Sequence, residues 1–142
     1  MGAAVRTVAL IMQEEKAMLE AYTLNVDVAQ DTAIPFNNTT IKKGCTVSHD
    51  SPSSFELNKC GVYMVSVNAS LETSGTIQLF KDGVPQAQAQ ATGGVPSFTT
   101  LVQVAENNTC CPCTSPTTLQ VVNTGTADIT CTSCNIAITK VI

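Results

Sequence analysis

From residue 26 onward, short runs of alternating apolar and polar residues are interrupted by glycine or proline about every ten residues. In the longest run, apolar residues occupy every second position and would share one face of a strand: Tyr63, Val65, Val67, Ala69 and Leu71. The dipeptide Asp82-Gly83, between two further runs, is typical of a tight hairpin turn. This pattern predicts an all-β sandwich. No fixed-period repeat is present, which excludes propellers and solenoids.

The individual strands can be placed from the same alternation and from the turn residues that flank each run. The candidate strands cover residues 24–28, 33–36, 39–41, 46–48, 54–57, 61–72, 75–81, 84–91, 96–105, 117–123, 127–131 and 135–141.

The first residues have a different composition. Residues 9–21 are dominated by Ala, Met, Leu, Glu, Gln and Lys, which are strong helix formers, so we expect a helix over 5–24. A helix of this length is not stable alone in water. We expect it to pack against its own domain, a helix of a sister chain or a foreign surface. The chain then divides into an attachment or oligomerisation segment, 1–25, and a β-domain, 26–142. The apolar residues expected to make the attachment are Val8, Ile11, Met12, Leu19 and Tyr22.

Charge is scarce, and this limits the partners. Charged residues make up 13% of the chain, about half the usual share, and the net charge is −4. Lys and Arg are few and unclustered in sequence, which argues against nucleic acid. No apolar run approaches the ~20 residues of a membrane span. From residue 83 to the end, only Glu106, Asp128 and Lys140 are charged, so we expect an oligomer. The alternative is a monomer whose surface is coated with Ser, Thr and Asn.

The chain has seven cysteines, an odd number that intrachain disulfides cannot all pair. Two C-x2-C pairs have the spacing of a structural zinc site: Cys110 with Cys113, and Cys131 with Cys134. Free thiols or disulfides in a strand-rich domain explain the same residues, because a small buried cysteine packs well in a core. We predict no cofactor, with structural zinc as the alternative.

Catalytic motifs are missing from the sequence. The only histidine, His49, falls in an expected solvent-exposed turn, and its spacing from the cysteines does not support a dyad. There is no G-x-S-x-G elbow and no glycine-rich phosphate loop. We predict that the protein is not an enzyme.

Several segments resemble a known family. Phe55-x-Leu57 followed by Gly61-x-Tyr63-x-Val65-x-Val67 is similar to the core strand pair of the tumour necrosis factor-like superfamily, which includes the complement globular heads. The motifs Cys110-Cys111 and Pro116-Thr-Thr-Leu-Gln-Val-Val-Asn123 resemble its bacterial and phage branch. The resemblance covers about residues 26–142 and implies a ten-stranded jelly roll that assembles as a homotrimer. On that basis the strand of Tyr63 and the last strand are expected at the trimer interface, through Tyr63, Val65, Val67, Ile136 and Ile138. Alternatively, Tyr63, Val65 and Val67 fill the core of each protomer.

The same resemblance implies a display function without catalysis. The favoured hypothesis is a trimeric bacteriophage capsid decoration or head-fibre protein, assembled in the host cytoplasm and held on the virion surface. Its segment 1–25 would bind the major capsid protein or another virion subunit. The alternatives are a bacterial spore-surface protein and a receptor- or glycan-binding module whose loops 86–96 and 107–115 meet a ligand on a host surface. Neither nucleic acid nor membrane is an expected partner.

Overall fold

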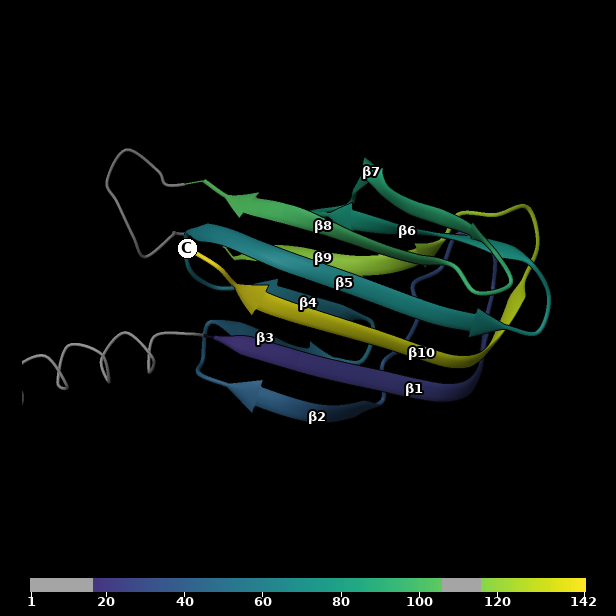
Figure 1. Cartoon of the computed structure of the whole chain (residues 1–142), viewed down its shortest axis with the longest axis horizontal. Helices are drawn as coiled ribbons and strands as arrows, with labels where there is room; N and C mark the ends of the chain where they lie inside the picture. Colours follow the sequence, from purple (N-terminus) through teal and green to yellow (C-terminus); the bar gives the residue numbers. More distant parts are fainter. Residues whose placement is uncertain (1–16, 106–115) are drawn as a thin grey trace, which may run out of the picture.

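A computed structural model describes residues 17–105 and 116–142, which form two layers of β-strands (Figure 1). The strands are β1 (Met18–Val28), β2 (Asn38–Lys43), β3 (Val47–Ser51), β4 (Ser54–Leu57), β5 (Gly61–Leu71), β6 (Gly75–Lys81), β7 (Val84–Gly93), β8 (Ser97–Val104), β9 (Thr117–Asn123) and β10 (Ile129–Lys140). The described residues contain no helix long and apolar enough to cross a membrane.

Each layer is a five-stranded antiparallel sheet. Sheet A has the order β2-β1-β10-β5-β8, and sheet B has the order β3-β4-β9-β6-β7. Most neighbours within a sheet are distant in sequence, and strands that follow one another along the chain often lie in different sheets. This connectivity is that of a jelly roll. The expectation of an all-β, ten-stranded jelly-roll sandwich is confirmed.

The core lies between the two sheets and is built from every second residue of the central strands. On sheet A, Tyr63, Val65 and Val67 are fully buried, and they belong to the same core cluster as Leu79 and Leu119 of sheet B. The hydroxyl of Tyr63 donates a hydrogen bond to the carbonyl oxygen of Lys59 at 2.6 Å. The buried hydroxyl of Tyr63 therefore has a hydrogen-bond partner, as buried polar groups usually do.

The predicted helix is wrong over its last residues. The segment from Met18 to Leu24 belongs to β1, which pairs with β10 in antiparallel register, Leu19 opposite Ile138 and Ala21 opposite Ile136. Leu19, Ala21 and Thr23 point into the core. Helix propensity amounts to a few tenths of a kcal/mol per residue, and burial of alternate side chains against β10 outweighs it. The expected domain boundary at 25/26 falls inside β1, and residues 5–16 of the expected helix lie outside the described residues.

Two other strand predictions differ from the structure. The runs 127–131 and 135–141 form one strand, β10, with a local irregularity between Cys131 and Ser133. Residues 33–36 form only an isolated bridge, Ala33 to Val122, because the connection between β1 and β2 of sheet A touches β9 of sheet B only briefly.

The two ends of the sandwich are not equivalent. Residue 17 enters at the end where β2, β8 and β10 finish, and the Lys140 amide donates to the Ala17 carbonyl at 2.9 Å. At the opposite end, the chain makes the β1–β2, β3–β4, β5–β6, β7–β8 and β9–β10 connections (Figure 1). Residue 17 and the tips of these loops therefore lie at opposite ends of the molecule.

Candidate functional site

The residues expected at the trimer interface lie inside the protomer. Tyr63, Val65, Val67, Ile136 and Ile138 are each 0% exposed in a single chain and belong to the core between the sheets. A side chain with no exposed surface cannot contact a second chain, so the interface role that we expected is not open to these five residues. The alternative assignment, to the protomer core, describes them correctly.

The neighbours of these residues in sequence form the outer face of sheet A. Because strand side chains alternate, a shift of one residue moves a position from the core to the surface. Cross-strand pairing arranges the outward residues in three rows across β1, β10, β5 and β8. The rows are Met18–Thr139–Met64–Leu101, Glu20–Ala137–Ser66–Thr99 and Tyr22–Asn135–Asn68–Ser97.

Across β1, β10, β5 and β8, the outer face of sheet A is almost free of charge, whereas Lys43 of the edge strand β2 lies beside Met18. Glu20 is the one ionisable carboxylate in the three rows, and no lysine or arginine lies in them. In the first row, Met64 and Leu101 are cross-strand partners that remain 41% and 61% exposed. Depletion of charge around exposed apolar side chains is typical of the central part of a protein–protein interface. This face is the candidate functional site.

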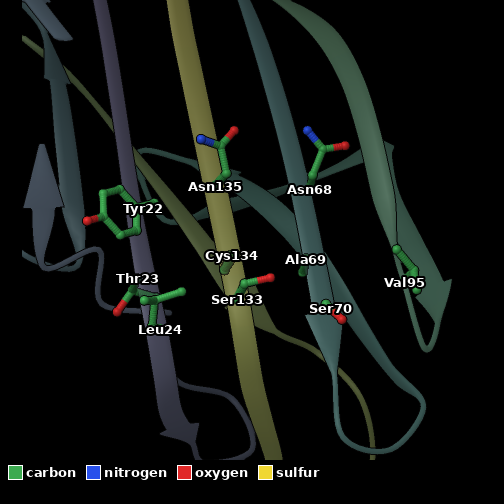
Figure 2. Close-up of a pocket in the computed structure, with 10 residues that line it drawn as sticks. All are labelled: Tyr22, Thr23, Leu24, Asn68, Ala69, Ser70, Val95, Ser133, Cys134 and Asn135. Carbon is green, nitrogen blue, oxygen red and sulfur yellow. The ribbon is translucent and has the colours of Figure 1, made fainter. Parts of the chain in front are cut away.

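A shallow depression of about 220 Å³ lies at one end of this face (Figure 2). Tyr22, Asn135 and Asn68 lie on three adjacent strands at its edge, and Figure 2 shows the two amides on neighbouring strands. Leu24 and Val95, 56% and 74% exposed, supply its apolar surface. The lining groups can donate and accept hydrogen bonds and can cover apolar surface, but their acid–base chemistry is limited to the phenol of Tyr22 and the thiol of Cys134.

Only part of the expected attachment set falls on described residues. Leu19 is 1% exposed and packs in the core, so it is a core residue rather than a surface residue. Tyr22 lies on the outer face of sheet A, next to the depression. Val8, Ile11 and Met12 lie outside the described residues.

The single histidine, His49, is fixed by ring stacking and by contacts of both ring nitrogens. His49 lies in β3 and is half-buried, not in an exposed turn as expected. Its ring stacks on Phe55 with a centroid distance of 4.2 Å. Nε2 lies 3.1 Å from the Pro52 carbonyl, to which it donates, and Nδ1 lies 3.3 Å from the Thr39 hydroxyl. His49 therefore connects the edge strands of the two sheets, β2 and β3, which is a structural role.

The cysteines on described residues have different environments. Cys131 and Cys134 are buried in the core, and burial raises the pKa of the first thiol to about 11 and of the second to about 12. Both are therefore neutral thiols near pH 7. Cys60 is buried and disulfide-bonded, whereas Cys45 is an exposed free thiol. Cys110 and Cys113, the other half of the candidate zinc set, lie outside the described residues. Within the described residues, no three His, Cys, Asp or Glu side chains are grouped to hold a metal ion.

Asn123 is a structural residue that sequence reasoning did not single out. Its side chain is fully buried, its amide donates to the carbonyls of Val28 at 3.2 Å and Ala127 at 2.9 Å, and its Oδ1 accepts the Gly125 amide at 3.1 Å. It joins the end of β1 to the β9–β10 turn. The signal was present, because Asn123 closes the Leu-x-Val-x-Asn segment on which the resemblance rests.

Comparison with known proteins places the fold. No family model matches the sequence, and no curated protein matches it. Solved structures do match. The PRD1 vertex protein P5 aligns with a TM-score of 0.62 at 12% identity, over 89% of this chain and 97% of that chain. The globular domain of a zebrafish complement 1qA protein gives 0.65 at 11%, over 89% and 97%. The Eiger TNF of S. frugiperda gives 0.65 at 12%, over 89% and 92%. The chain therefore has the tumour necrosis factor-like jelly-roll fold, as the sequence resemblance implied.

Proposed function

We propose that this chain is a non-enzymatic structural subunit of a bacteriophage particle, a homotrimer displayed on the virion surface as a capsid decoration or head-fibre protein. The observation that carries the proposal is the outer face of sheet A, where exposed Met64 and Leu101 lie in a surface almost free of charge. A vertex protein, PRD1 P5, is among the solved structures that share the fold over nearly their whole length.

The outer face of sheet A has the properties needed for self-association. Residues that face water on a monomer are usually rich in charge, because charge maintains solubility. Here the central strands β10 and β5 present Asn, Ala, Thr, Ser and Met instead. Three copies that cover this face around an axis would bury Met64 and Leu101 and leave the charged ends of the sandwich in water. The trimer agrees with the sequence resemblance.

Attachment to the particle would use the segment that precedes β1. Residue 17 enters at one end of the sandwich, and the connections at the other end are distant from it (Figure 1). A chain held through residues 1–16 by the major capsid protein or another virion subunit would present those connections outward. This arrangement suits a display subunit.

The absence of catalysis is part of the proposal and is supported by the state of the reactive side chains. His49 is held by Phe55, Thr39 and the Pro52 carbonyl. Cys131 and Cys134 are buried, with pKa values raised by burial. None of these three groups is presented to a substrate in the described structure.

Solution mass tests the proposal first. Light scattering of the purified full chain, at neutral pH with reductant, should give a particle near three times the 14.9 kDa protomer. A monomer at micromolar concentration would refute the trimer. Immunogold labelling of particles released at lysis should then place the protein on the virion, and deletion of residues 1–16 should remove the label while the trimer persists. Label that survives the deletion would refute attachment through this segment.

A further inference from the structure

The charged side chains of the described residues are sorted towards the two ends of the sandwich. All five lysines of the described residues lie at the end where residue 17 enters, and we call this end the lysine end: Lys42 and Lys43 finish β2, Lys59 lies before β5, Lys81 finishes β6 and Lys140 finishes β10. The opposite end has carboxylates and no lysine: Asp27, Asp31, Asp50, Glu72 and Asp128.

Cross-strand pairs and hydrogen bonds place these lysines at one end of the sandwich. Lys43 pairs with Met18, the first residue of β1, and Lys140 pairs with Tyr63, near the start of β5. The Lys81 ammonium donates to the carbonyl of Gln103, near the end of β8, at 2.8 Å. Three carboxylates share this half of the molecule, Glu20, Glu56 and Asp82. Among the described side chains at this end, lysines therefore outnumber carboxylates by five to three.

Exposed apolar side chains lie among these lysines. Val84, which pairs with Lys81, is 58% exposed, and Val141 and Ile142, which follow Lys140, are 45% and 77% exposed. Lys81 and Lys140 are half-buried, and each ammonium donates to a main-chain oxygen, that of Gln103 for Lys81 and that of Ile142, at 2.7 Å, for Lys140. Exposed apolar side chains with polar groups at their rim are one arrangement found at protein-binding surfaces.

We propose that the lysine end is a docking surface for an acidic protein surface. This inference rests on the proposed function, because it names the chemistry of the partner next to which residues 1–16 would be anchored. A nucleic acid is a poorer fit. The lysines at this end are few, no arginine lies among the described residues, and three carboxylates share this half of the molecule. The exposed valines and isoleucine match apolar contacts on a protein better than a phosphate backbone.

Binding to immobilised poly-L-glutamate, measured by interferometry with the full chain at low ionic strength, tests the charge at this end. The informative variant is Lys42→Gln with Lys43→Gln and Lys59→Gln, all at exposed positions. The matched control is Thr73→Glu with Ser74→Glu and Thr126→Glu, exposed at the other end, which changes the net charge by the same amount. We expect the wild type and the control to bind and the lysine variant to bind about tenfold more weakly, with all binding reduced at physiological salt.

Each other outcome overturns the inference. Equal loss in both variants would mean that net charge, not the lysine end, governs binding, and a wild type that does not bind would remove the surface altogether. Tighter binding of the wild type to phosphatidylglycerol vesicles or to duplex DNA would assign the lysines to lipid or nucleic acid. Solution mass separates this test from the proposed function. A trimeric lysine variant that binds as well as wild type refutes only the docking surface, whereas a monomeric wild type refutes the trimer whatever its binding.

Discussion

Charge placed on the outer face of sheet A should separate the protomers without unfolding them. We consider the double variant Met64→Glu with Leu101→Glu, which changes two cross-strand partners at the β5–β8 end of the first row. Both side chains point away from the core, so their replacement leaves the packing between the sheets in place. We expect a folded monomer in place of the trimer.

The size of the effect follows from exposure. Full burial of a Met or Leu side chain is worth about 1.5–3 kcal/mol. Met64 and Leu101 retain 41% and 61% of their exposure in the protomer, so covering both would contribute about 1.5–3 kcal/mol per chain. Three chains together would gain about 5–9 kcal/mol. The variant loses this gain and must also desolvate carboxylates, so trimer dissociation should become at least about a thousandfold easier.

Analytical ultracentrifugation measures the dissociation, and circular dichroism with urea unfolding measures the protomer. The control is Gln88→Glu with Gln90→Glu, which adds the same two charges at exposed positions of β7 in sheet B and should remain trimeric. The reciprocal variant is Ile136→Ala in the core, which should lower the free energy of unfolding by about 2–5 kcal/mol and leave the association of folded chains unchanged. If the double variant stays trimeric, or if the sheet B control dissociates equally, the assignment of the interface to the outer face of sheet A is refuted.

Four further results are expected. Asn123→Ala should lower the free energy of unfolding by about 3 kcal/mol in urea titrations, because it leaves the Val28 and Ala127 carbonyls without their partner; an unchanged midpoint would contradict this. In the native protein, Ellman's reagent at pH 8 should modify Cys45 but spare Cys131 and Cys134. Stability should fall as the pH rises above 9.0, because the two thiols ionise there only when unfolded, their folded pKa values being about 11 and about 12; flat stability up to pH 11 would contradict the burial argument. Elemental analysis should find no stoichiometric zinc. The predicted zinc site would need Cys110 close to Cys134. Cys134 pairs with Ala69, which lies about 26 Å along β5 from Gly61, and Gly61 pairs with Val104 at the end of β8. The five residues from Ala105 to Cys110 span at most about 18 Å, which is too short to cover that distance.

Local sequence determined most of the strands but not the start of β1. The alternation in β5 and the hairpin signal at Asp82-Gly83 depend on neighbouring residues, and both predictions hold in the structure. The pairing of Leu19 with Ile138 joins residues that are far apart in the chain. Ala, Leu, Met and Glu near residue 19 favour a helix when considered alone, and only contact with β10 makes the strand more stable. Non-local pairing of this kind leaves no mark in the local composition.

The outer face of sheet A could not be predicted from the sequence for a related reason. Alternation identifies two faces of β5 and β10, and the more apolar face was expected to serve both the core and the interface. In the structure, the core takes all of Tyr63, Val65 and Val67, so the interface that we propose would use the residues between them, which have little hydrophobic signal of their own.

The lysine end depends still more on topology. In sequence, the lysines between residues 42 and 140 are scattered, and their spacing suggests no patch. Antiparallel strands of similar length reverse direction at each turn, so residues at the ends of β2, β6 and β10 meet at one edge of the fold. Placement of a charge at the start or the end of a strand thus decides which end of the molecule carries it. In the display subunit that we propose, this placement would put the lysines at the end that meets the particle and most of the carboxylates at the end that faces solvent. It does so without any change in net charge or in the core.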